Sequence, residues 1–109
     1  MSSLSTHVLN TTLGLPAAGV ALTLCAGDKV LFSGEAGADG RWRCPLDLEA
    51  GRYRLEFAIA AHFTAKGVSL ATPPFFDTVG IDFNVAKDSG HYHVPLLVSP
   101  YGYSTYRGS

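Results

Sequence analysis

The feature that most constrains the fold is an alternation of apolar and polar residues, which recurs in short segments along the chain. In the clearest segment, residues 52–59, the apolar positions are Tyr53, Leu55, Phe57 and Ile59. Side chains of a β-strand point alternately to the two faces of a sheet. This period of two therefore predicts a strand with one face buried.

Further segments with the same period are separated by residues that favour turns. They lie at residues 4–9, 20–26, 29–35, 41–46, 78–85, 91–98 and 103–107. A short helix is predicted at residues 60–66, which Gly67 follows. About eight short strands with one helix predict an all-β fold, a β-sandwich of two sheets. The length of 109 residues fits a single domain that spans residues 1–109.

The chain carries few charged residues, and its formal net charge is −1. It has no basic or acidic block, so the sequence predicts neither a nucleic-acid partner nor an acidic membrane surface as a partner. Low charge combined with 47% hydrophobic residues predicts that apolar surface is covered in an oligomer. The alternative is an ordinary, somewhat apolar monomer.

The two cysteines, Cys25 and Cys44, do not make a disulfide framework in a chain of this size. Alternation begins by Ser5, so no secretion signal is expected before the fold. Polar residues and Pro16 interrupt the uncharged beginning of the chain, so a transmembrane helix is not predicted either. These features predict a protein of the reducing cytoplasm.

Residues 91–109 combine a β-hairpin pattern with an unusual set of side chains. One face of the first strand carries His91, His93, Pro95 and Leu97, and the other face is continuously apolar. Two imidazoles on an otherwise apolar face call for a reason beyond packing. Most chains fray into polar residues at the end, whereas residues 106–109 read Tyr-Arg-Gly-Ser. This combination indicates a site built partly from the C-terminal residues.

The side chains that can carry chemistry are imidazoles and guanidinium groups. They are His7, Arg41, Arg43, His62, His91 and His93. Each also has an ordinary structural explanation. His7 fits a solvated edge of its strand, His91 fits a residue that caps a turn, and His62 fits the exposed surface of the helix. His93, further into its strand, is the hardest to explain by structure alone.

Three kinds of site fit these residues to different degrees. A His-x-His pair with a third histidine is typical of metal ligands, but no carboxylate or thiol stands beside it. A Ser-His-Asp triad is not indicated, because the chain lacks a G-x-S-x-G segment and no serine has an evident base partner. A site in which histidine activates water and arginine polarises a carbonyl needs only the residues present. We therefore predict a site without metal or other cofactor.

Five motifs carry a family resemblance. They are residues 5–9 (Ser-Thr-His-Val-Leu), Gly14-x-Pro16-Ala17, residues 39–41 (Asp-Gly-Arg), residues 91–103 (His-Tyr-His-Val-Pro-Leu-Leu-Val-Ser-Pro-Tyr-Gly-Tyr) and residues 106–109 (Tyr-Arg-Gly-Ser). They resemble the transthyretin-related proteins and, more narrowly, the 5-hydroxyisourate hydrolases of urate degradation. The resemblance spans the whole chain, and the terminal hairpin is its most specific part. Asn10 departs from it, because the family usually has Asp there; we expect Asn10 in a loop just past the strand, with little effect on activity.

The resemblance implies a transthyretin-like sandwich of two four-stranded sheets, assembled as a homotetramer, a dimer of dimers, with a central channel. It implies that the small-molecule substrate 5-hydroxyisourate is hydrolysed to 2-oxo-4-hydroxy-4-carboxy-5-ureidoimidazoline. By the same resemblance, the catalytic residues are His7, Arg41, His93 and Ser109, and the substrate-binding residues are Tyr106, Arg107 and Gly108.

In the implied reaction one imidazole takes a proton from water, and Arg41 stabilises the oxyanion. The base is His93 or His7, and Arg43 lies outside the motif. The main alternative is a transthyretin-like carrier that binds small hydrophobic ligands in the channel of the tetramer. His93 distinguishes the two, because the carrier has Thr at this position, and the carrier also lacks the Tyr-Arg-Gly-Ser end.

Overall fold

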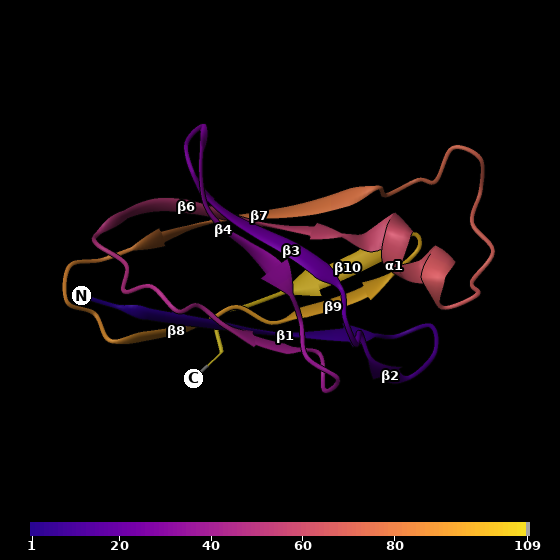
Figure 1. Ribbon diagram of the computed structural model, residues 1–109, viewed down its shortest axis with the longest axis horizontal. Helices are drawn as coiled ribbons and strands as arrows, with labels where there is room; N and C mark the ends of the chain where they lie inside the picture. The colour runs from indigo at the N-terminus through magenta and orange to yellow at the C-terminus, as the bar shows by residue number, and fades with distance from the viewer. Residues whose placement is uncertain (109) are drawn as a thin grey trace.

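The computed structural model describes residues 1–108 and shows two β-sheets packed face to face, with a short helix at one end (Figure 1). The elements are β1 (Ser3–Asn10), β2 (Leu15–Pro16), β3 (Ala21–Ala26), β4 (Lys29–Glu35), β5 (Arg41–Arg43), β6 (Gly51–Ala58), α1 (Ile59–Ala65), β7 (Thr78–Val85), β8 (His91–His93), β9 (Leu96–Ser99) and β10 (Gly102–Thr105). The predicted all-β sandwich with one short helix is confirmed.

The first sheet is organised around β1. On one side, β8 and β9 pair with β1 in parallel, and on the other side β5 and β2 pair with it antiparallel. The strand β10 continues the sheet beyond β9. The short strands β8 and β9 follow one another along one side of β1, and β5 and β2 do the same along its other side. The sheet is therefore four strands wide, with β10 at one edge.

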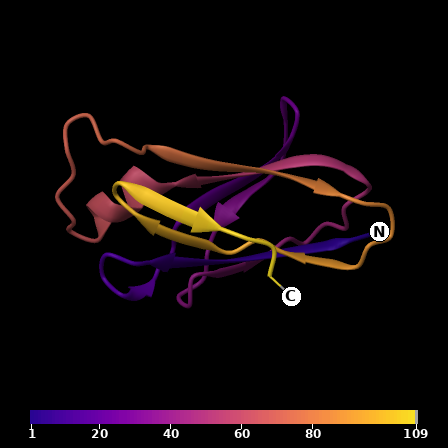
Figure 2. The same cartoon turned by 180° about the vertical axis from the view of Figure 1, so that it is seen from behind.

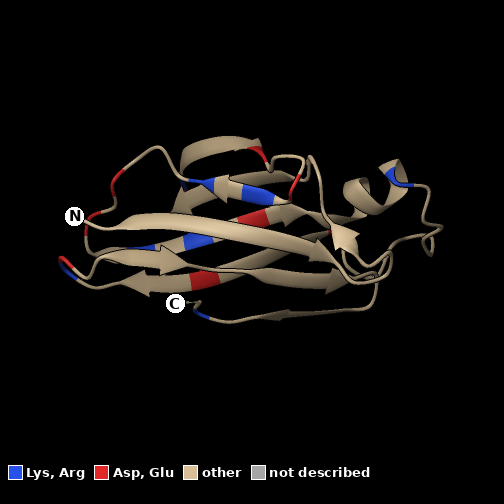
Figure 3. Cartoon of the chain, turned by 90° about the horizontal axis from the view of Figure 1, so that it is seen from below, with Lys and Arg blue, Asp and Glu red and all other residues tan. Residues whose placement is uncertain are grey.

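The second sheet has the order β4-β3-β6-β7, and all of its pairs are antiparallel. On its outer face, Arg54 lies between two carboxylates, with Nε 3.1 Å from Glu56 Oε2 and Nη1 3.2 Å from Asp82 Oδ2. Figure 3 shows that positive and negative residues are interspersed over the strands and loops. Such half-exposed pairs contribute little to stability, so packing must supply most of it.

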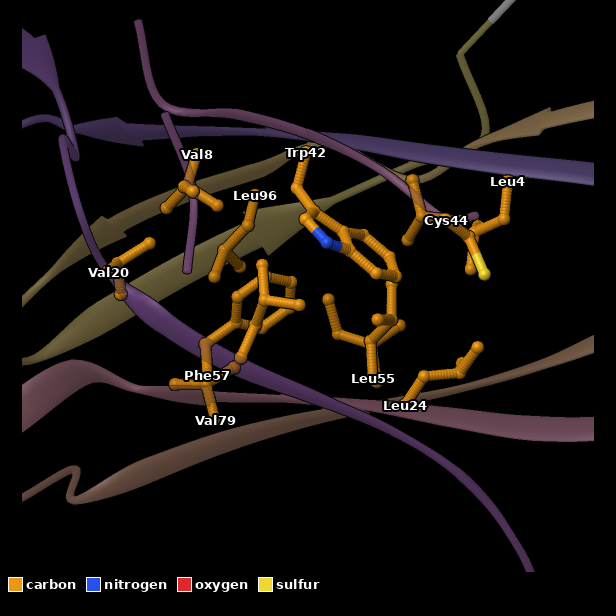
Figure 4. Close-up of a cluster of buried hydrophobic side chains, with 14 of the residues drawn as sticks. Leu4, Val8, Val20, Leu24, Trp42, Cys44, Leu55, Phe57, Val79 and Leu96 are labelled. Atoms are coloured by element: carbon orange, nitrogen blue, oxygen red, sulfur yellow. The ribbon is translucent and has the colours of Figure 1, made fainter. Parts of the chain in front are cut away.

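The core lies between the two sheets, where the predicted inward positions meet. Leu55 and Phe57 of β6 pack with residues from the opposite sheet, among them Trp42 and Leu96 (Figure 4). On β1 the buried positions are Leu4, Thr6 and Val8, as the alternation predicts. The buried hydroxyl of Thr6 donates a hydrogen bond to the Val94 carbonyl at 2.6 Å, so burying it leaves no donor unsatisfied.

The predicted strand 91–98 is interrupted at Val94 and Pro95, which separate β8 from β9. Proline has no backbone N–H to donate, so one hydrogen bond of the ladder is missing there. The register with β1 does not slip across the gap, since Ser5 pairs with His93 and Val8 pairs with Leu96 at the same offset. The alternation of faces is therefore preserved through the break.

The expectations for His62 and Asn10 are wrong. His62 is buried and does not lie on the helix surface, and Asn10 is buried as the last residue of β1, not in the following loop. Asn10 Oδ1 accepts the Leu13 N–H at 3.0 Å, and its Nδ2 lies 3.2 Å from Nε2 of His62. The two polar groups satisfy each other, which is why both can be buried.

Among residues 1–108, no helix has the length and apolar character that crossing a membrane requires. The sequence likewise predicted no transmembrane helix.

We predict that the folded chain loses stability as the pH falls below about 6.5, the pKa of an unfolded histidine. Burial, helped by the positive charge of Lys66, lowers the pKa of His62 in the folded chain. Below the unfolded-state pKa, the unfolded chain takes up a proton that the folded chain resists, so the free energy of unfolding falls. Burial lowers the pKa of His93 as well, and this adds to the effect.

The variant Asn10→Asp tests how much of this loss of stability comes from His62. A carboxylate beside the imidazole favours its charged form, so the variant should lose less stability between about pH 7.5 and about pH 5.5 than the native chain. Urea unfolding at both pH values measures this. An identical loss in the two proteins would show that the Asn10–His62 contact does not control the protonation of His62.

Candidate active site

The outward face of β1 gathers the predicted site residues because both neighbouring strands meet it in register. Ser5 lies opposite His93 on the parallel side, and His7 lies opposite Arg41 on the antiparallel side. Leu4, Thr6 and Val8 fill the inward positions, so Ser5 and His7 must face outward. Residues from three separate parts of the sequence thus come together on one face.

A cavity of about 410 Å³ lies on this face. Its lining residues are Ser5, Thr6, Asp39, Arg41, Trp42, Arg43 and His93. Arg43, which the family motif leaves out, therefore contributes to the same cavity as Arg41. The lining includes an imidazole, a carboxylate, two guanidinium groups and two residues with hydroxyls, a set of polar groups that can bind a small polar molecule and take part in acid–base chemistry.

His7 is held by the turn that precedes β5. Its Nε2 lies 2.9 Å from the carbonyl oxygen of Asp39. A carbonyl only accepts, so Nε2 of His7 carries the proton and Nδ1 is the unprotonated nitrogen of the neutral ring. Gly40 allows this approach, because a Cβ there would lie 2.4 Å from the Val8 carbonyl oxygen, and its φ of +75° disfavours other residues.

Asp39 also orients Arg41. Its Oδ1 accepts the backbone N–H of Arg41 at 3.1 Å, and its Oδ2 lies 3.8 Å from Nε of the guanidinium. One residue therefore holds His7 through its backbone and Arg41 through its side chain. In the sequence, Asp39 is part of the Asp-Gly-Arg motif but has no predicted role of its own; the signal that could have singled it out is its place two residues before Arg41.

His93 is partly buried and lies beside Ser5. The Ser5 hydroxyl is 2.8 Å from Nδ1 of the ring. Burial lowers the pKa of His93, and the neighbouring charges of His91, Arg41 and His7 lower it further. The imidazole is therefore neutral near physiological pH, the state in which it can accept a proton. His91, at the start of β8, is exposed.

The C-terminal segment returns across β8 after β10 ends, as Figure 2 shows. The Gly108 N–H donates to the His93 carbonyl oxygen at 2.7 Å. A Cβ at Gly108 would lie only 2.6 Å from Cδ2 of the His93 ring. Gly108 therefore lets the backbone lie directly against the imidazole. Ser109 lies outside the described residues.

The other two residues of the predicted tail lie elsewhere. The Arg107 guanidinium carbon lies 4.1 Å from the centre of the Tyr92 ring. Together with Tyr106, Arg107 lines a separate cavity beside β7, which also includes Phe83. The structure thus brings together His7, Arg41, His93 and Gly108, while the side chains of Tyr106 and Arg107 lie apart from the cavity beside His93.

Within residues 1–108, no three side chains of His, Cys, Asp or Glu cluster as metal ligands would. The four histidines are engaged in other ways, His62 with Asn10, His7 with Asp39, and His91 and His93 with serines.

Comparison with known proteins identifies the family. The HIUase/Transthyretin family matches residues 4–108. The chain belongs to this family. It is 52% identical over 115 residues to the 5-hydroxyisourate hydrolase of Caulobacter vibrioides, with all of both chains covered.

Solved structures of the family share the fold. The 5-hydroxyisourate hydrolase of Klebsiella pneumoniae matches with a TM-score of 0.88 at 38% identity, and the match covers all of both chains. Sea bream transthyretin in complex with thyroxine matches with a TM-score of 0.83 at 28% identity, over 96% of this chain and 93% of the other. A hydrolase and a thyroxine-bound protein thus share this sandwich. The fold alone therefore does not indicate the function, which has to be argued from the residues of the site.

Proposed function

We propose that this protein hydrolyses 5-hydroxyisourate to 2-oxo-4-hydroxy-4-carboxy-5-ureidoimidazoline, a step of urate degradation. The full-length similarity to proteins with that activity supports the substrate. The single observation that carries the chemistry is the neutral, partly buried imidazole of His93 in a cavity that it shares with Arg41. A cytoplasmic location remains a prediction from the sequence.

His93 is the general base in this proposal. Nδ1 of His93 contacts Ser5, so we assign Nε2 as the nitrogen that takes a proton from the attacking water. This water attacks the ring carbonyl next to the hydroxylated carbon of the substrate. We choose His93 over His7 because His93 lines the cavity, whereas His7 is fixed against the Asp39 carbonyl. His7 then serves to hold the polar edge of the substrate through Nδ1.

Arg41 stabilises the oxyanion that forms as water adds to the carbonyl. Asp39 holds its backbone and lies near its guanidinium, so the positive charge is placed before the reaction begins. Gly108 keeps the His93 ring in place from the other side. We further assign Ser109 to catalysis, and Tyr106 and Arg107 to substrate binding, on the family resemblance; these three assignments remain predictions.

The competing function is that of a carrier for small hydrophobic ligands, because sea bream transthyretin, whose structure is a complex with thyroxine, has the same fold. A carrier site needs apolar walls and few fixed polar groups. The cavity on β1 is instead lined by Ser5, Asp39, Arg41, Arg43 and His93. This polar lining supports the hydrolase.

We predict that the protein accelerates the decay of 5-hydroxyisourate and that His93→Thr abolishes this. The substrate is unstable, so it is generated in the cuvette from urate by urate oxidase, and its decay is followed by absorbance. Loss of a general base lowers turnover by about 10²–10⁴-fold, while Thr suits a strand and should leave the fold intact.

A matched pair of arginine variants serves as the control. Arg41→Gln should reduce turnover strongly, whereas Arg52→Gln, at an exposed position on the other sheet, should not.

Turnover should also survive exhaustive chelation, because the proposed chemistry uses no metal. Decay at the uncatalysed rate with native protein would refute the function, and loss on chelation with recovery on adding Zn²⁺ would refute the metal-free mechanism.

We also propose a homotetramer, a dimer of dimers. The strands β7 and β10 are edges of their sheets, and unpaired edges in soluble proteins are normally covered or blocked. Near them, Phe75 and Tyr101 are 67% and 66% exposed, with ring centres 6.0 Å apart. An exposed aromatic cluster beside open edges is typical of a subunit interface.

Light scattering should therefore give a mass of four chains at micromolar protein. Phe75→Ala should shift the mass toward smaller species on dilution, because it removes an aromatic side chain that the interface would bury. Val30→Ala, an exposed apolar position on the opposite edge strand β4, should not. A monomer in the native protein would rule out the assembly.

A further inference from the structure

Three short hydrogen bonds connect His93 to Ser3 at the start of β1. The Ser5 hydroxyl lies 2.8 Å from Nδ1 of His93 and 2.8 Å from Nε2 of His91. The other ring nitrogen of His91, Nδ1, lies 2.6 Å from the hydroxyl of Ser3. Two of the distances are in the usual range of hydrogen bonds between nitrogen and oxygen, and the third is slightly shorter. Two serines and two imidazoles thus alternate in an unbroken chain.

The pairing of β1 with β8 produces this chain. Ser3 lies opposite His91 and Ser5 lies opposite His93 in a parallel register, with all four side chains on the outward face. The ring of His91 reaches from one serine to the next, so both of its nitrogens are engaged. His93 is partly buried and His91 is exposed, so the chain runs from the cavity toward solvent.

The protons in the chain are coupled. The Ser5 hydroxyl has one proton, so it donates to one of the two imidazoles and must accept from the other if both hydrogen bonds are to form. In one direction, His93 donates from Nδ1 and its Nε2 is unprotonated. In the opposite direction, Ser5 donates to Nδ1 and the proton of His93 is on Nε2. Whether His93 is a base or an acid at Nε2 therefore depends on the direction of the whole chain.

The hydrolysis needs the direction in which His93 donates from Nδ1. Only then is Nε2, the ring nitrogen that Ser5 does not contact, unprotonated and able to take a proton from water. In that direction Ser5 donates to Nε2 of His91, and His91 donates from Nδ1 to Ser3.

We propose that Ser5 and His91 are positioning residues for the hydrolysis, forming with Ser3 a proton relay that keeps Nε2 of His93 unprotonated and conducts a proton from the cavity to solvent. The role in catalysis rests on the proposed function. The sequence offered no sign of it beyond the position of His91 on the same face as His93.

The transfers balance in protons. As water attacks, its O–H bond breaks and Nε2 of His93 takes the proton. Nδ1 of His93 passes its own proton to Ser5 Oγ, Ser5 passes its proton to Nε2 of His91, and Nδ1 of His91 passes its proton through Ser3 to solvent. Every group in the chain ends neutral. His93 now carries its proton on Nε2 and donates it to the leaving nitrogen of the substrate ring, while a proton from solvent returns through Ser3, His91 and Ser5 to Nδ1, so His93 ends neutral with Nε2 unprotonated again.

The test compares Ser5→Thr with Ser5→Val. Both side chains are β-branched, suit a strand and have nearly the same shape, but only Thr keeps the hydroxyl. Ser5→Val should lower kcat by about 10- to 100-fold with little change in KM, the factor that a hydrogen bond to a group that becomes charged is worth. Ser5→Thr should restore most of the turnover. His91→Phe, which keeps a ring without its nitrogens, should behave like Ser5→Val.

Two further readouts separate a relay from a packing role. The titratable and charged groups that face His93 are His91 on β8, His7 on β1 and Arg41 on β5, and all of them remain in Ser5→Val. A shift in the acidic limb of the pH–rate profile would then come from the lost hydroxyl. Nitrogen-15 NMR of the histidine rings at neutral pH should show the proton of His93 on Nδ1 in the native protein and in Ser5→Thr, and a mixture of tautomers in Ser5→Val.

Equal kcat and equal tautomers in Ser5→Val and Ser5→Thr would overturn the relay. A native protein without turnover would instead refute the proposed function, and the NMR comparison would still decide whether the hydroxyl sets the tautomer of His93.

Discussion

The parallel pairing of β1 with β8 and β9 is the interaction on which the rest of the structure depends. It joins residues 88 positions apart, and it places the first strand at the centre of its sheet with partners on both sides. Contacts this distant in sequence carry a large loop-closure cost and are rewarded only when the core forms. The same pairing fixes Ser5 beside His93, so the stability of the sandwich and the geometry of the site have one cause.

The faces of the strands could be predicted from sequence because burial alternates with residue number. This accounts for the inward positions of β1 and β6 and for the shared outward face of His7 and His93. Register could not be predicted in this way, since sliding a strand by two residues preserves its faces. The contacts of Asp39 with His7 and Arg41, and those of Ser5 with both histidines, depend on register and therefore needed the structure.

Two errors have a common origin. The sequence placed Asn10 in a loop just past its strand and His62 on the surface of the helix, because each is polar. In the structure each satisfies the other across the gap between β1 and α1, which no local pattern reveals. The same holds for Ser5, which the alternation places on the outward face of its strand without revealing its two histidine partners. In each case a polar residue was judged alone, whereas its partner lies dozens of residues away.

The Ser5 hydroxyl of β1 and the backbone of the returning tail hold the reacting imidazole of His93 in place. The most direct measurement is kcat/KM of Gly108→Ala beside Gly102→Ala, with melting temperatures for both. A Cβ at Gly108 would meet the His93 ring at 2.6 Å, whereas at Gly102 it would meet Ser99 Oγ at an ordinary 3.8 Å. Displacement of a catalytic group by about 1 Å can cost 10²-fold, so Gly108→Ala should lose most turnover without losing its fold, and Gly102→Ala should keep it. Full turnover in Gly108→Ala would contradict the account.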